Sequence, residues 1–289
     1  MTAGPPARVR INGAEQAPDA AVVSVFDRGF QYGDGVFETA ALIDGCVREA
    51  DAHIDRLCRG ARLLGMPPPE REGLQADLTA MGEGVAAGER AVVKVVYTRG
   101  SGGRGLQPPA TPRPTRVVMR LPWPGHPAAW REQGVRVISC RTRQMSGAAL
   151  DGRIKSMNQL NHIVARMEWT DPEIAEGLLC DEDGGIVEGT VTNLFAVREG
   201  EVVTPDLARS GLPGVTRGRL LEVAASLGIP AQERPLAHDE LGTADELFLT
   251  NSIVGVWPVR ELDGRAVADG RPGPITRRLQ AALEAIYAA

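Results

Sequence analysis

Residues 152–169 read GRIKSMNQLNHIVARMEW and contain the most informative side chain of the sequence, Lys155. The chain has 32 lysines and arginines together, but only Lys94 and Lys155 are lysines. Arginine stays protonated and cannot act as an amine nucleophile. A lysine in an arginine-rich chain is therefore a candidate for chemistry that needs a free amine, such as Schiff-base formation. The simpler alternative is a surface lysine at the start of a helix.

Composition excludes several classes of function. The net charge of −5 and the pI near 5.5 do not predict a nucleic-acid-binding surface. No apolar run approaches the roughly 18 residues that span a bilayer, and the N-terminus lacks the apolar core of a signal peptide. The four cysteines show no CxxC spacing and no HExxH occurs, so neither a metal site nor a disulfide framework is expected. These features predict a reduced, cytoplasmic protein without a membrane segment.

Periodicity predicts a mixed fold in two domains. Strands are expected at 8–12, 21–26, 36–43, 91–98, 116–121, 135–140 and 247–252, with a further strand–turn–strand region over 177–204. Helices are expected at 50–64, 70–86, 216–227 and 274–287, and directly after Lys155, where Leu160, Ile163, Val164 and Met167 form an apolar stripe. This order indicates α+β or mixed-sheet α/β rather than a doubly wound parallel sheet. Prolines mark a linker at 121–127, between an N-terminal domain over 1–120 and a C-terminal domain over 128–289.

The segment 100-GSGGRG-105 matches the GxGxxG pattern of dinucleotide-binding loops, but we reject that interpretation. Such a loop must open a helix, and the prolines that follow within residues 108–114 prevent one. The segment is better explained as a loop carrying Arg99 and Arg104, whose guanidinium groups suit a carboxylate. An exposed loop without a ligand is the alternative.

Two charged residues lie in apolar surroundings. Arg56 is in 53-HIDRL-57, next to the apolar face of the predicted helix, where it could hold a phosphate or face solvent. Glu188 is in the strand-like run 186-IVEGTVTNLF-195, on the same face as Ile186. A carboxylate inside an apolar strand requires a hydrogen-bonding partner, and a protonated pyridine nitrogen would be suitable. The alternative is that Glu188 lies on an edge strand and faces water.

A possible anion site begins at 213-PGVTRGRLLEVAASLG-228, where a loop enters a helix near Thr216. Exposed N–H groups and a threonine hydroxyl can bind an anion, although simple capping by Thr216 explains the same pattern. Asn251 and Ser252 offer further small donors at the end of a strand. An amine, a carboxylate and phosphate-type sites together are what pyridoxal phosphate (PLP) requires.

The chain resembles the fold-type IV PLP enzymes, which include branched-chain aminotransferases, D-amino-acid transaminases and aminodeoxychorismate lyases. The segments that carry the resemblance are 27-DRGFQYGDGVFET-39, 53-HIDRL-57, 94-KVVYTRGSGGRG-105, 154-IKSMNQLNHIVAR-166, 187-VEGTVTNLF-195, 211-GLPGVTRGRLLE-222 and 247-LFLTNSIVGVWPV-259. They occur in the family's order over nearly the whole chain. The resemblance implies a smaller N-terminal α/β domain, a larger C-terminal domain with a barrel-like sheet, PLP between them, and a homodimer whose partner loop helps to enclose the site.

The resemblance also implies a role for individual residues. Lys155 becomes the lysine that forms the internal aldimine, and Glu188 the partner of the pyridine nitrogen. Arg56, Val215, Thr216 and Ser252 become the phosphate ligands. Apart from the resemblance, the loop chemistry makes Arg99 and Arg104 the candidates for binding substrate carboxylates.

Within this family, the segments 27–39, 98–105 and 251–259 are most similar to 4-amino-4-deoxychorismate lyases, which make 4-aminobenzoate and pyruvate for folate precursor synthesis. D-Amino-acid transaminases carry an Arg-x-His pair where this chain has Arg104-Gly105-Leu106, and branched-chain aminotransferases carry a tyrosine where it has Leu160. An aminotransferase using the same Lys155 remains the second interpretation. A binding protein that has lost activity is the third, and intact Lys155 and Glu188 speak against it.

Overall fold

The computed structural model describes residues 4–145 and 153–288. The chain forms two compact units. The N-terminal unit comprises the residues up to Gly125 together with Ile154–Asn158, and the C-terminal unit comprises His126–Arg153 and the residues from Gln159 onward. In the part of the chain that is described, no helix has the length and apolar character needed to cross a membrane.

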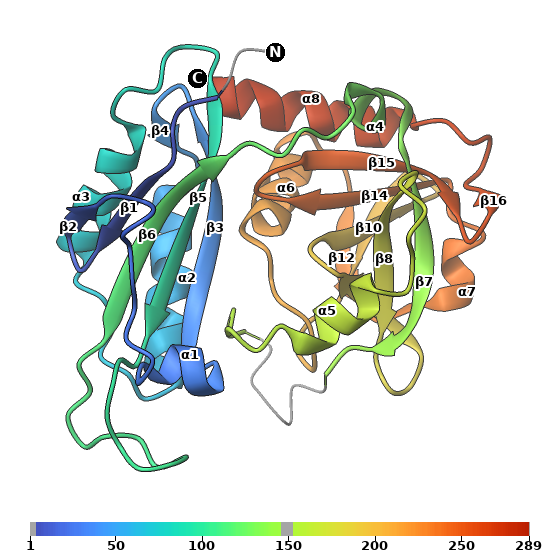
Figure 1. Cartoon of the computed structure of the whole chain (residues 1–289). Helices are drawn as coiled ribbons and strands as arrows, with labels where there is room; N and C mark the ends of the chain where they lie inside the picture. The colour runs from blue at the N-terminus through green and yellow to red at the C-terminus, as the bar shows by residue number, and fades with distance from the viewer. Residues whose placement is uncertain (1–3, 146–152, 289) are drawn as a thin grey trace. The chain divides into compact units, whose positions relative to one another are not determined.

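The N-terminal unit is built on a six-stranded antiparallel sheet (Figure 1). In spatial order its strands are β2 (Ala14–Gln16), β1 (Arg8–Ile11), β6 (Thr115–Pro122), β5 (Arg90–Thr98), β3 (Gly35–Ile43) and β4 (Cys46–Val47). The β3–β4 hairpin turns at Asp44-Gly45, as predicted, with both residues at positive φ. Helices α2 (Ala50–Leu63) and α3 (Arg71–Gly82) pack on this sheet and bury Ile54, Leu57 and Leu74.

The C-terminal unit contains a ten-stranded sheet that curls into a nearly closed barrel. In spatial order its strands are β12 (Ala231–Arg234), β11 (Glu201–Pro205), β10 (Asn193–Arg198), β14 (Glu246–Asn251), β15 (Gly255–Leu262), β7 (Val135–Arg143), β8 (Ile174–Cys180), β9 (Gly185–Gly189) and β13 (Leu236–Ala237), with β16 (Arg265–Ala266) on β15. One apolar core includes Val137, Leu178, Leu249 and Trp257. The mixed α/β architecture confirms the predicted fold class.

Helices complete the C-terminal unit. They are α4 (Ala128–Gln133), α5 (Leu160–Arg166), α6 (Val215–Ser226), α7 (His238–Leu241) and α8 (Pro274–Ala288). Helices α6 and α8 pack on each other and on β14, forming a second core around the stacked rings of Phe195 and Phe248. Helix α5 instead contacts β7 and β8 through the buried Ala165.

Two sequence predictions are wrong. Residues 21–26 form no strand; they leave Val22 and Phe26 69% or more exposed, because an alternating pattern does not by itself supply a neighbouring strand. The helix expected over 70–86 ends at Gly82, whose close approach to the Gly45 carbonyl leaves no room for a side chain. The helix predicted after Lys155 does form, as α5, and its apolar stripe is exposed in the described structure, where Leu160 is 72% and Ile163 55% exposed.

Two segments next to β3 and β5, residues 99–114 and helix α1 (Arg28–Tyr32), lie near the residues proposed for the site. Residues 99–114 contain no helix between β5 and β6, which confirms the rejection of a dinucleotide-binding loop. Helix α1 was not predicted; it is a single turn that begins at the Asp27 cap and ends at Gly33. The loop before Lys155, at 146–152, lies outside the described residues.

Candidate functional site

Lys155 belongs to the N-terminal unit and is fixed through its backbone to the start of β3. Its carbonyl accepts a hydrogen bond from Phe37 N at 3.0 Å, and Met157 N donates to the Gly35 carbonyl at 3.0 Å. Through these bonds, Ser156 forms an isolated antiparallel bridge with Val36 of β3. The amine Nζ then lies 4.6 Å from the centre of the Phe37 ring. The backbone at Lys155 is therefore held in place by two hydrogen bonds to β3.

The second lysine of the chain is at the same ring. Nζ of Lys94, on β5, lies 5.3 Å from the centre of the Phe37 ring. The register explains this proximity, because Phe37 pairs with Val96 and the side chain of Lys94 lies two residues along the same face. Lys94 received no role from the sequence, although the scarcity of lysine was a signal that could have identified it.

Arg56 is buried and paired, not solvated. Its Nε and Nη2 each donate to a different oxygen of Glu38 at 2.7 Å, and His53 Nδ1 lies 2.7 Å from the same carboxylate. Burial alone would raise the pKa of Glu38, but the charge and hydrogen bonds of Arg56 and His53 lower it to about 2. The carboxylate is thus ionised at neutral pH and fixes the Arg56 guanidinium in one orientation. Glu38 and His53 could not be identified from the sequence, because their importance depends on this pairing.

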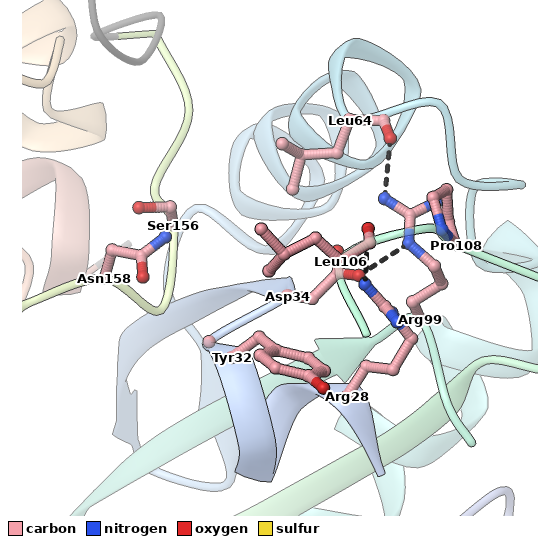
Figure 2. A pocket seen from close by; sticks show the side chains of 10 residues that line it. Arg28, Tyr32, Asp34, Leu64, Arg99, Leu106, Pro108, Ser156 and Asn158 are labelled. Atoms are coloured by element: carbon pink, nitrogen blue, oxygen red, sulfur yellow. Dashed lines mark hydrogen bonds and ion pairs between the residues drawn. The ribbon is translucent and has the colours of Figure 1, made fainter. Parts of the chain in front are cut away.

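A cavity of about 310 Å³ opens in the N-terminal unit beside the start of β3. Figure 2 shows its lining, in which Arg99 and Arg28 meet at Asp34. Both Nε atoms donate to the same oxygen of Asp34, at 2.8 and 2.7 Å. Burial acts to raise the pKa of Asp34, but the hydrogen bonds from Arg99 and Arg28 outweigh it and the pKa lies below its ordinary value. Ser156 and Asn158, which follow Lys155, line the same cavity.

The two arginines of the predicted carboxylate site differ in their surroundings. Arg99 is buried, and besides Asp34 it donates to the Leu64 carbonyl at the end of α2. Arg104 is exposed in the loop between β5 and β6, where its backbone pairs with Gln107. Within residues 4–145 and 153–288, the Arg104 guanidinium has no hydrogen bond or ion pair. Arg99 is therefore built into the protein framework, whereas Arg104 is available to a ligand.

Glu188 lies in the C-terminal unit, in β9, and is only 6% exposed. Oε1 accepts a hydrogen bond from Gln144 Nε2 at 2.6 Å, and Oε2 accepts one from Leu212 N at 3.0 Å. Asn193 Nδ2 lies 3.4 Å from Oε2, and Asn161 Nδ2 orients Gln144 by donating to its Oε1 at 2.8 Å. The alternative of an edge-strand carboxylate facing water is wrong, because β9 is paired on both sides, by β8 and β13.

The predicted phosphate ligands of the C-terminal unit meet at the start of α6. The helix begins at Val215 after Gly214, so Thr216 lies in the first turn and not at the cap. The hydroxyls of Thr216 and Ser252 are 3.3 Å apart. A side chain at Gly214 would collide with Asn193 Oδ1, which explains the glycine at this point. Helix N–H groups and two hydroxyls make this a suitable place for an anion.

The chemistry of the side chains in each unit suits two of the three polar groups of PLP. In the N-terminal unit, the Lys155 amine has the chemistry to react with an aldehyde, and the buried Arg56 guanidinium has the charge to bind a phosphate. In the C-terminal unit, the buried Glu188 carboxylate is a suitable acceptor for a protonated ring nitrogen, and the hydroxyls of Thr216 and Ser252 at a helix start suit a phosphate. Glu188 accepts hydrogen bonds from three neutral donors, and the imidazole Nε2 of His162 lies 3.8 Å from its Oε1. A carboxylate in this setting can accept a hydrogen bond from a protonated ring nitrogen.

Comparison with known proteins agrees with this chemistry. The amino-transferase class IV family matches residues 35–262. The structure of 4-amino-4-deoxychorismate lyase from Pseudomonas aeruginosa is 41% identical, covers 96% of this chain and 98% of that one, and superposes with a TM-score of 0.86. A Methanocaldococcus jannaschii chain, provisionally assigned as a branched-chain-amino-acid aminotransferase, is 36% identical over 94% of each chain.

Some of the similar structures contain derivatives of the cofactor. The T.th. branched-chain amino acid aminotransferase with pyridoxamine 5'-phosphate is 27% identical, covers 99% of this chain and 95% of that one, and has a TM-score of 0.86. The family match covers well over half of the sequence, and the fold agrees over nearly all of it. This chain therefore belongs to the class IV aminotransferase family of PLP-dependent enzymes.

Proposed function

We propose that the chain is a 4-amino-4-deoxychorismate lyase that forms 4-aminobenzoate, a folate precursor, and pyruvate. The observation that carries this proposal is the 41% identity to the Pseudomonas aeruginosa lyase over 96% of the chain. The Arg104-Gly105-Leu106 sequence, which lacks the histidine of a D-amino-acid transaminase, supports the same choice. The aminotransferase alternative is supported by the 36% identity to the Methanocaldococcus jannaschii chain.

Bound PLP supplies an aldehyde that condenses with amines and a ring that takes up negative charge. Lys155 Nζ would hold the cofactor aldehyde and would remove the proton from C4 of the substrate. Loss of that proton accompanies cleavage of the bond to the enolpyruvyl oxygen, and the substrate ring becomes aromatic. The proton removed from C4 balances the one that the leaving enolpyruvate needs to become pyruvate.

The remaining site residues hold the cofactor in our proposal. Glu188 accepts a hydrogen bond from the pyridine nitrogen and keeps it protonated. Arg56, Val215, Thr216 and Ser252 bind the phosphate, by charge, by backbone N–H and by hydroxyl groups. The bidentate pairing of Arg56 with Glu38 leaves the orientation of the guanidinium fixed before any ligand arrives.

We propose Arg99 and Arg104 for the substrate carboxylates, and Arg104, whose guanidinium is exposed, is the one that can be tested without breaking the bonds that Arg99 makes to Asp34 and Leu64. Arg104→Gln should raise KM about tenfold with little change in kcat, because it removes one charge-assisted hydrogen bond at an exposed position. Steady-state kinetics of 4-aminobenzoate formation measure both constants. Arg113→Gln, in the same loop, is a matched control that should leave KM unchanged. A KM for Arg104→Gln equal to the wild-type value would remove Arg104 from the site.

One experiment separates the three interpretations of function. Purified protein is supplied with enzymatically generated aminodeoxychorismate, and 4-aminobenzoate is followed by fluorescence, beside D-alanine and branched-chain amino acids as amino donors. The lyase interpretation expects 4-aminobenzoate and no accumulation of pyridoxamine phosphate. Pyridoxamine phosphate formed from an amino donor, without 4-aminobenzoate, would establish an aminotransferase. A colourless protein that PLP cannot reconstitute would indicate a binding protein.

We also propose that the chain forms a homodimer. The segment that was wrongly predicted as a strand exposes Val22, Val25 and Phe26, and neighbouring Phe30 is 75% exposed. Such a group of exposed apolar side chains is typical of a protein–protein interface. Sedimentation equilibrium should give a mass of twice the 30.8 kDa chain, and Phe30→Asp should shift the population to monomer. A wild-type protein that stays monomeric at micromolar concentration would contradict the proposal.

A further inference from the structure

Glu176, in β8, is a fully buried carboxylate that the proposed reaction does not use. Its side chain accepts hydrogen bonds from Gly177 N and Thr190 N at 2.9 and 3.1 Å, and from the Thr190 hydroxyl. Its second oxygen accepts from Val191 N at 3.1 Å and from the Thr192 hydroxyl at 3.0 Å. Burial raises the pKa of Glu176 above its ordinary value, and these donors oppose the rise. Four of the five donors come from one turn, Thr190–Thr192.

The strand register explains why a carboxylate is needed here. The ladder between β8 and β9 ends at the Leu178–Gly189 pair. Beyond it, Thr190 N is shared between the Gly177 carbonyl, at 3.0 Å, and the Glu176 carboxylate, which also accepts from Val191 N. A Cβ at Gly189 would lie 2.9 Å from Glu176 Cγ, so the turn is packed directly on the Glu176 side chain.

This turn joins two parts of the proposed cofactor site. It connects Glu188, near the end of β9, to Asn193, at the start of β10. The Asn193 side chain donates a hydrogen bond to the Glu188 carboxylate. In addition, the Val191 carbonyl accepts a hydrogen bond from Asn251 Nδ2 at 3.1 Å. Asn251 Oδ1 in turn accepts from the backbone N–H groups of residues 253 and 254, at 2.8 and 2.9 Å. Ser252, a proposed phosphate ligand, lies inside the turn that Asn251 closes.

We propose that Glu176 is a positioning residue that sets both the pyridine-nitrogen side and the phosphate side of the cofactor site through the Thr190–Thr192 turn. The connection runs from the Glu176 carboxylate to the turn, from the turn to Glu188 and Asn193, and from the turn through Asn251 to Ser252. This inference rests on the proposed PLP site, and it predicts that a buried group remote from the chemistry controls cofactor affinity.

Glu176→Gln tests the proposal with little change in shape. The amide keeps one acceptor oxygen, but its NH2 group cannot accept, so the backbone N–H of either Gly177 or Val191 loses its acceptor. The dissociation constant of PLP for the apoprotein should rise about tenfold, because an unsatisfied buried donor would displace the turn that positions the site residues. Pyridoxal, which lacks the phosphate, should lose less affinity, because only its ring nitrogen depends on a residue that the turn positions, Glu188. The pH midpoint of the bound cofactor's visible absorption band should also shift.

Glu168→Gln is the matched control. Glu168 also accepts two backbone N–H groups and a threonine hydroxyl, from Arg141 and Thr142, and none of these donors belongs to the Thr190–Thr192 turn. It should lower thermal stability without changing either dissociation constant. If Glu176→Gln does not fold, Thr192→Val removes one of the five donors and should act in the same direction, with Thr142→Val as its control.

The outcomes are distinct. Lower stability for Glu176→Gln with unchanged PLP and pyridoxal affinities would show that the residue is only structural, and so overturn the inference. Equal losses for PLP and pyridoxal would overturn the connection to Ser252. A wild-type protein that takes up no PLP would overturn the proposed function itself, and this inference with it.

Discussion

Replacing Lys155 with alanine is expected to reduce kcat by about 10⁴-fold or more, which is typical when a nucleophile that also transfers protons is removed. The variant should still fold, because the bonds that join this segment to β3 are made by backbone atoms. It should also still bind PLP through the phosphate and ring contacts, but without a covalent bond. The measurements are the rate of 4-aminobenzoate formation and borohydride reduction of the PLP-loaded protein, followed by peptide mapping.

Lys94→Ala is the control for this experiment, because Lys94 is the other lysine and lies at the same aromatic ring. In that variant the reduced cofactor should still be found on the peptide that contains Lys155. A label on the Lys94 peptide of the wild-type protein, or substantial turnover by Lys155→Ala, would rule out the assigned role of Lys155.

Glu188→Gln is expected to lower kcat by about 10²- to 10³-fold while PLP retention changes much less. A neutral amide does not keep the pyridine nitrogen protonated, so the ring takes up the negative charge of proton removal less readily. The position itself should tolerate the substitution, because the amide oxygen can still accept a hydrogen bond from Gln144 or from Leu212 N. Single-turnover kinetics report proton removal, and equilibrium dialysis reports PLP retention.

Glu246→Gln provides a comparison within the same unit. Glu246 is also 6% exposed, and its carboxylate accepts hydrogen bonds from Ile275 N and Thr276 N at the start of α8. This variant should lose stability and retain its rate per bound cofactor. Equal losses of rate and PLP affinity in Glu188→Gln would mean that Glu188 holds the cofactor without tuning it.

Local patterns predicted most of the strands and helices, and failed where the outcome depends on distant partners. The β3–β4 hairpin follows from a turn sequence between two apolar runs, and α2 follows from its apolar face. Residues 21–26 have an equally good strand pattern, but no other strand pairs with them in the described structure. Helix α1 is one turn long, which is too short for a periodic pattern.

The candidate site was predictable to the extent that chemistry depends on residue type. Lys155, Glu188 and Thr216 could be proposed from the sequence because an amine, a carboxylate in an apolar strand and a helix start are recognisable locally. Glu38 and Glu176 were not, because most of their partners are distant in the sequence and are brought to them only by folding. Arg99 illustrates the converse: the sequence shows its charge but not that Asp34 and the Leu64 carbonyl already engage it.

The two lysines at the Phe37 ring have a practical consequence for amine-directed reagents. Because the chain has no other lysine, acylating agents and amine-reactive crosslinkers can modify only these two side chains and the terminal amino group. Immobilisation or dye labelling by such reagents would therefore modify the proposed site at the same time. Protection by the cofactor, read as unmodified Lys155 by mass spectrometry, would then measure occupancy directly, without background from other lysines.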